Sequence, residues 1–77
     1  MRLEDLKILI ENSDKQIRSE VVKVGKNQIY RDKDVFIVEK YEFTDENGVD
    51  MFSVIDGYAD IELAIRSAKT GLHIEQY

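Results

Sequence analysis

The feature that most constrains the fold is the pair Asn47-Gly48, which separates two stretches rich in β-branched and aromatic residues. This arrangement predicts a β-hairpin with a type I′ turn, which needs positive φ at both central residues. A two-residue loop then gathers apolar residues on one face of the hairpin, and a one-residue slip would reverse that pattern. We expect this face to pack on the core: Ile37, Tyr41, Phe43, Phe52 and Val54.

Two further patterns complete the predicted secondary structure. Apolar residues at helical spacing predict helices over residues 1–13 and 58–70, the second ending at Gly71. Residues 16–24 and 35–44 favour strands.

Shorter elements are less strongly patterned. A further short strand begins at Ile29, between predicted turns at residues 25–28 and 31–34. The last residues, 72–77, form a short strand or an ordered arm.

The order of these elements predicts one α+β domain over residues 1–77. It has an antiparallel sheet of three to four strands with an N-terminal and a C-terminal helix, in the order α-β-(β)-β-β-α, and the helices lie mainly on one face. A parallel sheet is disfavoured, because each parallel connection needs a crossover of about a dozen residues.

Several classes of chemistry have no support in the sequence. The 77 residues include no cysteine and one histidine, which argues against thiolate chemistry and zinc. His73 lies beyond the last predicted helix, and no nucleophile motif or phosphate-binding loop is present. We therefore predict a non-enzymatic protein without a cofactor. No apolar run approaches the roughly 18 residues of a membrane span, and we expect a cytoplasmic location.

Negative charge is concentrated in residues 41–65, which hold seven acids and no lysine or arginine, whereas the whole chain has net charge −5. Such a strip is a cation site, a surface that imitates nucleic acid, or the solvated side that keeps a small domain in solution. Its members are Glu42, Asp45, Glu46, Asp50, Asp56, Asp60 and Glu62.

The segment Asp45–Asp56 has the composition of a calcium loop but not its spacing. A helix–loop–helix calcium loop has glycine at position 6 and glutamate at position 12, whereas Gly48 is fourth and Asp56 is twelfth. A hairpin turn explains the same residues, so we expect no metal. A small metal-dependent enzyme that uses these acids remains an alternative.

A basic cluster surrounds the first predicted turn and includes Lys23, Lys26, Arg31 and Lys33, with Tyr30 available for stacking. The chain as a whole is acidic, so direct nucleic-acid binding is not expected.

In size and charge the chain is similar to small acidic inhibitors of nucleic-acid-handling enzymes, such as anti-CRISPR and anti-restriction proteins. No motif matches one of these families. The resemblance implies an alternative function, in which the acids of residues 41–65 occupy a groove that normally binds phosphates.

The leading hypothesis is a protein-binding module, with a second copy of the chain as one candidate partner. Two helical residues lie off their core stripes, and the run Val35–Val38 needs cover on both faces. The candidate contacts between copies are Ile8, Phe36, Val38 and Leu63.

Overall fold

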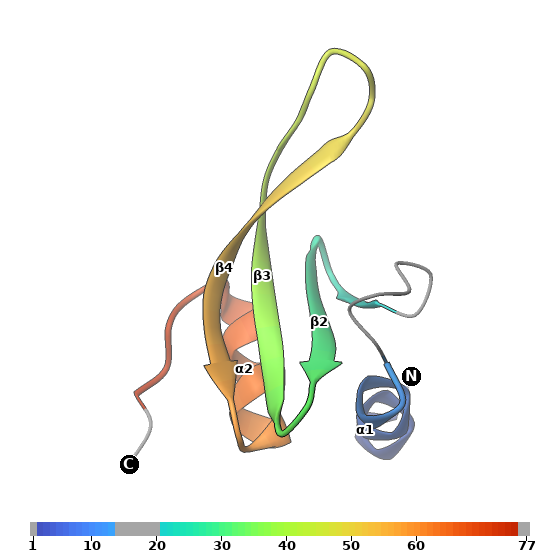
Figure 1. The fold of residues 1–77 in the computed structure, drawn as a ribbon, viewed down its shortest axis with the longest axis vertical. Coiled ribbons are helices and arrows are strands. Elements are labelled where there is room, and N and C mark those ends of the chain that lie inside the picture. The colour runs from blue at the N-terminus through green and yellow to red at the C-terminus, as the bar shows by residue number, and fades with distance from the viewer. Residues whose placement is uncertain (1, 14–20, 76–77) are drawn as a thin grey trace.

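The computed structural model describes residues 2–13 and 21–75. Four strands form one antiparallel sheet in the order β1-β2-β3-β4, with one helix before the strands and one after them (Figure 1). The predicted α+β class and element order are confirmed, and the further short strand predicted to begin at Ile29 is present. The elements are α1 (Leu3–Glu11), β1 (Val22–Val24), β2 (Asn27–Asp32), β3 (Val35–Thr44), β4 (Asp50–Tyr58) and α2 (Ile61–Thr70).

The second helix begins later than predicted, because Tyr58 is the last residue of β4. Asp60 is the N-cap of α2, and its carboxylate accepts a hydrogen bond from the Glu62 N–H at 2.8 Å. Gly71 ends the helix with φ of 71°, as the sequence predicts.

Boundaries also shift in the first half of the sheet. β1 matches the end of the strand predicted over residues 16–24, of which residues 16–20 lie outside the described part. β2 continues to Asp32, through part of the predicted turn, and the chain reverses at Lys33 and Asp34, where Lys33 has φ of 58°.

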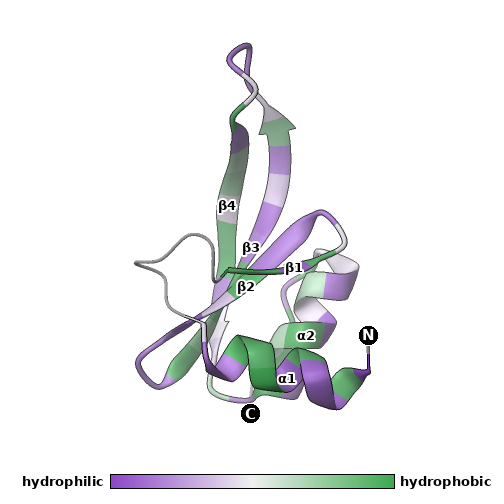
Figure 2. Cartoon of the chain, turned by 90° about the vertical axis from the view of Figure 1, so that its right-hand side faces the viewer, coloured by the Kyte–Doolittle hydropathy of each residue, from purple (hydrophilic) through white to green (hydrophobic). Residues whose placement is uncertain are grey.

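One core joins the sheet to both helices. Ile29 and Val38 are direct partners in the β2–β3 pair and are fully buried on the same sheet face. They pack with Ile10 of α1 and with Ala64 and Ala68 of α2. Both helices therefore cover this one face, and they lie side by side below the β3–β4 hairpin in Figure 2.

The residues after α2 are held against the end of β4. The N–H of Ile74 donates to the Tyr58 hydroxyl at 2.9 Å, and His73 Nε2 lies 2.8 Å from Asp56 Oδ2. Residues 73–75 form no regular structure, so within the described chain the tail is an ordered arm rather than a strand.

The β3–β4 turn differs from the predicted type I′ turn. Asp45 N–H donates to the Val49 carbonyl at 2.9 Å, and the Asp45 carboxylate accepts hydrogen bonds from the N–H groups of Asn47 and Val49. In this loop Gly48 has positive φ, 81°, and Asn47 does not. The hairpin therefore has a longer loop in which aspartate starts the turn and glycine ends it.

The longer loop shifts the strand register. Phe43 pairs with Met51, and Tyr41 pairs with Phe52, whereas the two-residue loop predicts Phe43 opposite Phe52. Irregularities between Val38 and Glu39, and between Tyr41 and Phe43, offset the register further. Bulges of this kind bend a hairpin and increase its twist, and the two strands cross in Figure 1.

Candidate functional site

The most distinctive feature of the molecule is the outer part of the β3–β4 hairpin. β2 pairs with β3 only as far as Glu39, whose partner in β4 is Val54, so the hairpin extends past β2 from this pair outward. We call residues 40–54 the distal arm. Figure 1 shows it projecting beyond β2 and α2.

Element lengths explain why the distal arm lies outside the core. A ten-residue helix such as α2 is about 15 Å long, whereas a ten-residue strand such as β3 spans about 33 Å. The helices therefore cover only the first half of β3, and the buried part of that strand ends at Val38. The predicted core face is wrong. Phe43 and Val54 are 56% and 60% exposed, and Ile37 lies on the sheet face opposite to the buried Val38. None of the five predicted residues belongs to the core: Ile37, Tyr41, Phe43, Phe52 and Val54.

The distal arm presents apolar side chains to solvent. Phe43 and Met51 lie directly opposite each other, so their side chains are neighbours on one face of the hairpin. The remaining exposed members are on the loop and at the base of the arm. The full set is Phe43, Val49, Met51 and Val54.

The partly buried side chains of Tyr41 and Phe52 pack against each other in the arm. Their rings pack edge to face with centroids 5.9 Å apart. Lys23 Nζ lies 4.3 Å from the centre of the Phe52 ring, and Lys26 Nζ lies 5.5 Å from that of Tyr41. Two members of the basic cluster therefore pack on the aromatic rings of the arm.

Three acids of the predicted strip are exposed on the distal arm: Glu42, Glu46 and Asp50. Glu42 accepts a hydrogen bond from Ser53 Oγ at 2.6 Å, and Asp50 accepts one from Thr44 Oγ1 at 2.8 Å. Both carboxylates remain at the surface while they are oriented by these neighbours.

The other four acids have roles within the chain. Asp45 shapes the turn and Asp60 caps α2, as described above. Asp56 contacts His73 and also accepts the Gly57 N–H at 2.7 Å. Glu62 accepts a hydrogen bond from Lys7 Nζ of α1 at 2.7 Å, and this bond raises the pKa of Lys7.

The seven acids consequently do not form one surface. Asp50 begins β4 and Asp60 follows its end, and the nine residues of that strand span about 30 Å. The arm and the start of α2 therefore present their charges at opposite ends of the sheet.

The predicted contacts between copies have different environments. Val38 is fully buried, and Phe36 and Leu63 pack against the core, so the fold itself covers these three side chains. Ile8 is 56% exposed on α1.

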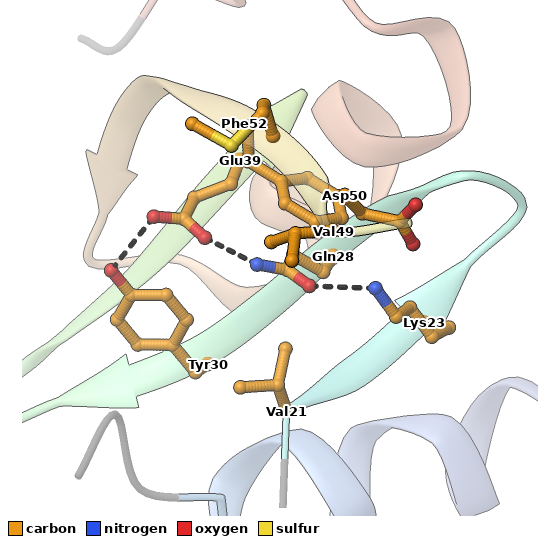
Figure 3. Close-up of a pocket in the computed structure, with 9 residues that line it drawn as sticks. Val21, Lys23, Gln28, Tyr30, Glu39, Val49, Asp50 and Phe52 are labelled. Atoms are coloured by element: carbon orange, nitrogen blue, oxygen red, sulfur yellow. Dashed lines mark hydrogen bonds between the residues drawn. The ribbon is translucent and has the colours of Figure 1, made fainter. Parts of the chain in front are cut away.

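A hollow of about 570 Å³ lies on the sheet face opposite the helices, beside the start of β4 (Figure 3). Hydrogen bonds cross it from Lys23 Nζ to Gln28, from Gln28 to Glu39, and from the Tyr30 hydroxyl to Glu39. Burial, together with the charge and hydrogen bond of Glu39, raises the pKa of Tyr30 to about 12. These polar groups bind one another, and no buried side-chain nitrogen or oxygen in the described chain lacks a hydrogen-bond partner.

The described residues also bear on two functional classes, metal-binding and membrane-spanning proteins. Over residues 2–13 and 21–75, no group of three or more histidine, aspartate or glutamate side chains is placed to hold a metal ion. Neither α1 nor α2 combines the length and hydrophobicity that a membrane-crossing helix needs.

Comparison with known proteins finds no matching family model, no matching curated protein and no matching solved structure.

The apolar surface of the distal arm is the part of the candidate site that sequence reasoning misses. A usable signal is present in the predicted lengths, because a hairpin with strands of about ten residues is longer than either predicted helix can cover.

Proposed function

We propose that this chain is a small non-enzymatic protein-binding module that contacts its partner through the distal arm. The supporting observation is that Phe43 and Met51 are paired and exposed on a projecting hairpin. Exposed apolar groups that lie together and are rimmed by charge are typical of protein contact surfaces. The acids Glu42, Glu46 and Asp50 form that rim.

The proposal is tested by affinity capture with matched variants. The double variant Phe43→Ser/Met51→Ser removes the apolar pair, and Ile8→Ser removes an apolar side chain on α1 that is exposed to the same extent as Phe43. We expect a protein captured by the wild type and by Ile8→Ser to be lost with the double variant. Capture that survives the arm substitutions but fails with Ile8→Ser would assign the contact to α1 and overturn the proposal.

A second candidate function is inhibition of a nucleic-acid-binding protein by the arm carboxylates. The observation in its favour is that Glu42, Glu46 and Asp50 are exposed on one projecting element. The variant Glu42→Lys/Glu46→Lys/Asp50→Lys should then lose the partner, and added nucleic acid should displace the wild type. Partner binding that is unaffected by salt and by nucleic acid would exclude this function.

A homodimer is a narrower form of the protein-binding proposal, because the partner is then a second copy. Light scattering across a concentration series tests it directly. A mass that stays at 9.0 kDa would exclude it.

A further inference from the structure

We infer that the outer edge of β4 over Asp50–Val54 binds an extended basic segment of a partner protein as an added strand. This inference rests on the protein-binding function proposed above and specifies how the distal arm would bind. β4 is the last strand in the order β1-β2-β3-β4. Alternate residues of such an edge strand direct their N–H and C=O groups away from the sheet, where another strand can pair with them.

The two halves of the β4 edge differ. Near its C-terminal end the tail approaches through the contacts of His73 with Asp56 and of Ile74 with Tyr58, and the Gly57 N–H is bound by the Asp56 carboxylate. Over Asp50–Val54, no backbone hydrogen bond joins the outer edge to another described segment. The free edge therefore coincides with the distal arm.

The opposite edge of the arm, along β3, is occupied at Tyr41. The Tyr41 N–H donates to Asn27 Oδ1 at 2.9 Å, and Lys26 lies over the Tyr41 ring. An added strand on that side would have to displace the β1–β2 turn. Within the described residues, the β4 edge over Asp50–Val54 is open to pairing along its length, whereas the β3 edge is blocked at Tyr41.

The negative charge of the arm favours a basic segment as the added strand. Residues 40–54 contain four acids and one base, so a second copy pairing along β4 would bring two negatively charged arms together. Lys or Arg at alternate positions of the segment would lie on one face, beside Asp50 of β4, within the negative field of the arm. Apolar residues between those bases would lie on the other face of the sheet, beside Met51, which is exposed.

The test uses the full chain and a ten-residue peptide that alternates lysine with valine. Two N-methylated forms of this peptide each remove the N–H donors from one of its two edges. Strand addition uses one peptide edge, so we expect one form to bind about tenfold or more weakly and the other to bind as the parent does. Amide signals of Asp50–Val54 should shift, and those of β1 should not.

The outcomes separate this inference from the broader proposal. Equal loss, or equal retention, with both N-methylated forms would overturn strand addition. A glutamate–valine peptide that binds equally well would overturn the basic occupant. A dimer in light scattering whose formation shifts the amide signals of Asp50–Val54 would also overturn it. If a cellular partner is still lost with Phe43→Ser/Met51→Ser in either case, the protein-binding function stands and the strand-addition inference fails.

Discussion

The Tyr58 hydroxyl donates a hydrogen bond to Ser67 Oγ at 3.2 Å, and both residues are fully buried between β4 and α2. Ser67 Oγ donates in turn to the Leu72 carbonyl at 2.7 Å, while the Tyr58 hydroxyl accepts the Ile74 N–H. This network ties the last strand, the last helix and the tail together inside the core.

Removal of the Tyr58 hydroxyl should destabilise the protein. Tyr58→Phe leaves the Ile74 N–H without its acceptor, and a buried group left unpaired costs about 1–3 kcal/mol. Urea unfolding measures the change. Tyr41→Phe is the control, because that hydroxyl bonds to Thr44 at the surface, and we expect a loss within about 0.5 kcal/mol. Equal losses in the two variants would contradict the assigned role of the network.

Asn27 joins α2 to the sheet through both ends of its amide. Its Nδ2 donates to the Ala68 carbonyl at 2.7 Å, and its Oδ1 accepts the Tyr41 N–H. We expect Asn27→Ala to cost about 1–3 kcal/mol in unfolding free energy. Asn27→Asp should cost at least as much, because it keeps the acceptor for Tyr41 but turns a carboxylate oxygen toward the Ala68 carbonyl. An Asn27→Asp variant as stable as the wild type would show that the contact with Ala68 is unimportant.

Two substitutions in β3 test where the core ends. Val38→Ala empties part of the buried cluster and should cost about 2 kcal/mol in unfolding free energy. Phe43→Ala removes a larger side chain five residues further along the same strand. It should nevertheless change the unfolding free energy by less than about 0.5 kcal/mol, because the Phe43 ring is mostly exposed. A larger loss at Phe43 than at Val38 would show that the distal arm has its own core.

Ionisation of the Tyr30 phenol should lower the free energy of unfolding in alkaline solution. Its pKa in the folded protein is raised from 10.0 to about 12, first by burial and then by Glu39. The fold therefore favours the neutral phenol, and this contribution is fully present below pH 10 and is lost as the pH rises toward 12. Phenolate absorbance, taken as the difference between wild type and Tyr30→Phe, follows this one group. Titration of that difference at the ordinary tyrosine pKa would contradict the assignment.

The sequence predicts the fold class and the order of elements because those depend on patterns that persist over many residues. Helical spacing in α2, the β-branched run of β3 and Gly71 as a helix end are each confirmed. The turn is harder to predict, because Asn47-Gly48 satisfies two turn types. The Asp45 carboxylate decides between them by binding two loop N–H groups, and its position before the pair is a signal for the longer loop.

The candidate site is harder to predict from the sequence than the fold is. Alternation along β4 shows which residues share a face, but it does not show whether anything covers that face. Phe43 and Val38 are both apolar residues of β3, and only the extent of the helices distinguishes the exposed one from the buried one. Charge counts have the same limit: Asp50 and Asp60 lie close in sequence and at opposite ends of a strand.

The division of the β3–β4 hairpin between a packed half and a projecting half has a consequence for evolution. Residues that pack beneath the helices cannot change without loss of folding free energy. The tip contributes little to that packing, so its side chains can vary under selection for what they touch. The proposed binding surface can thus change by mutation at the end of the longest hairpin at little cost in folding free energy.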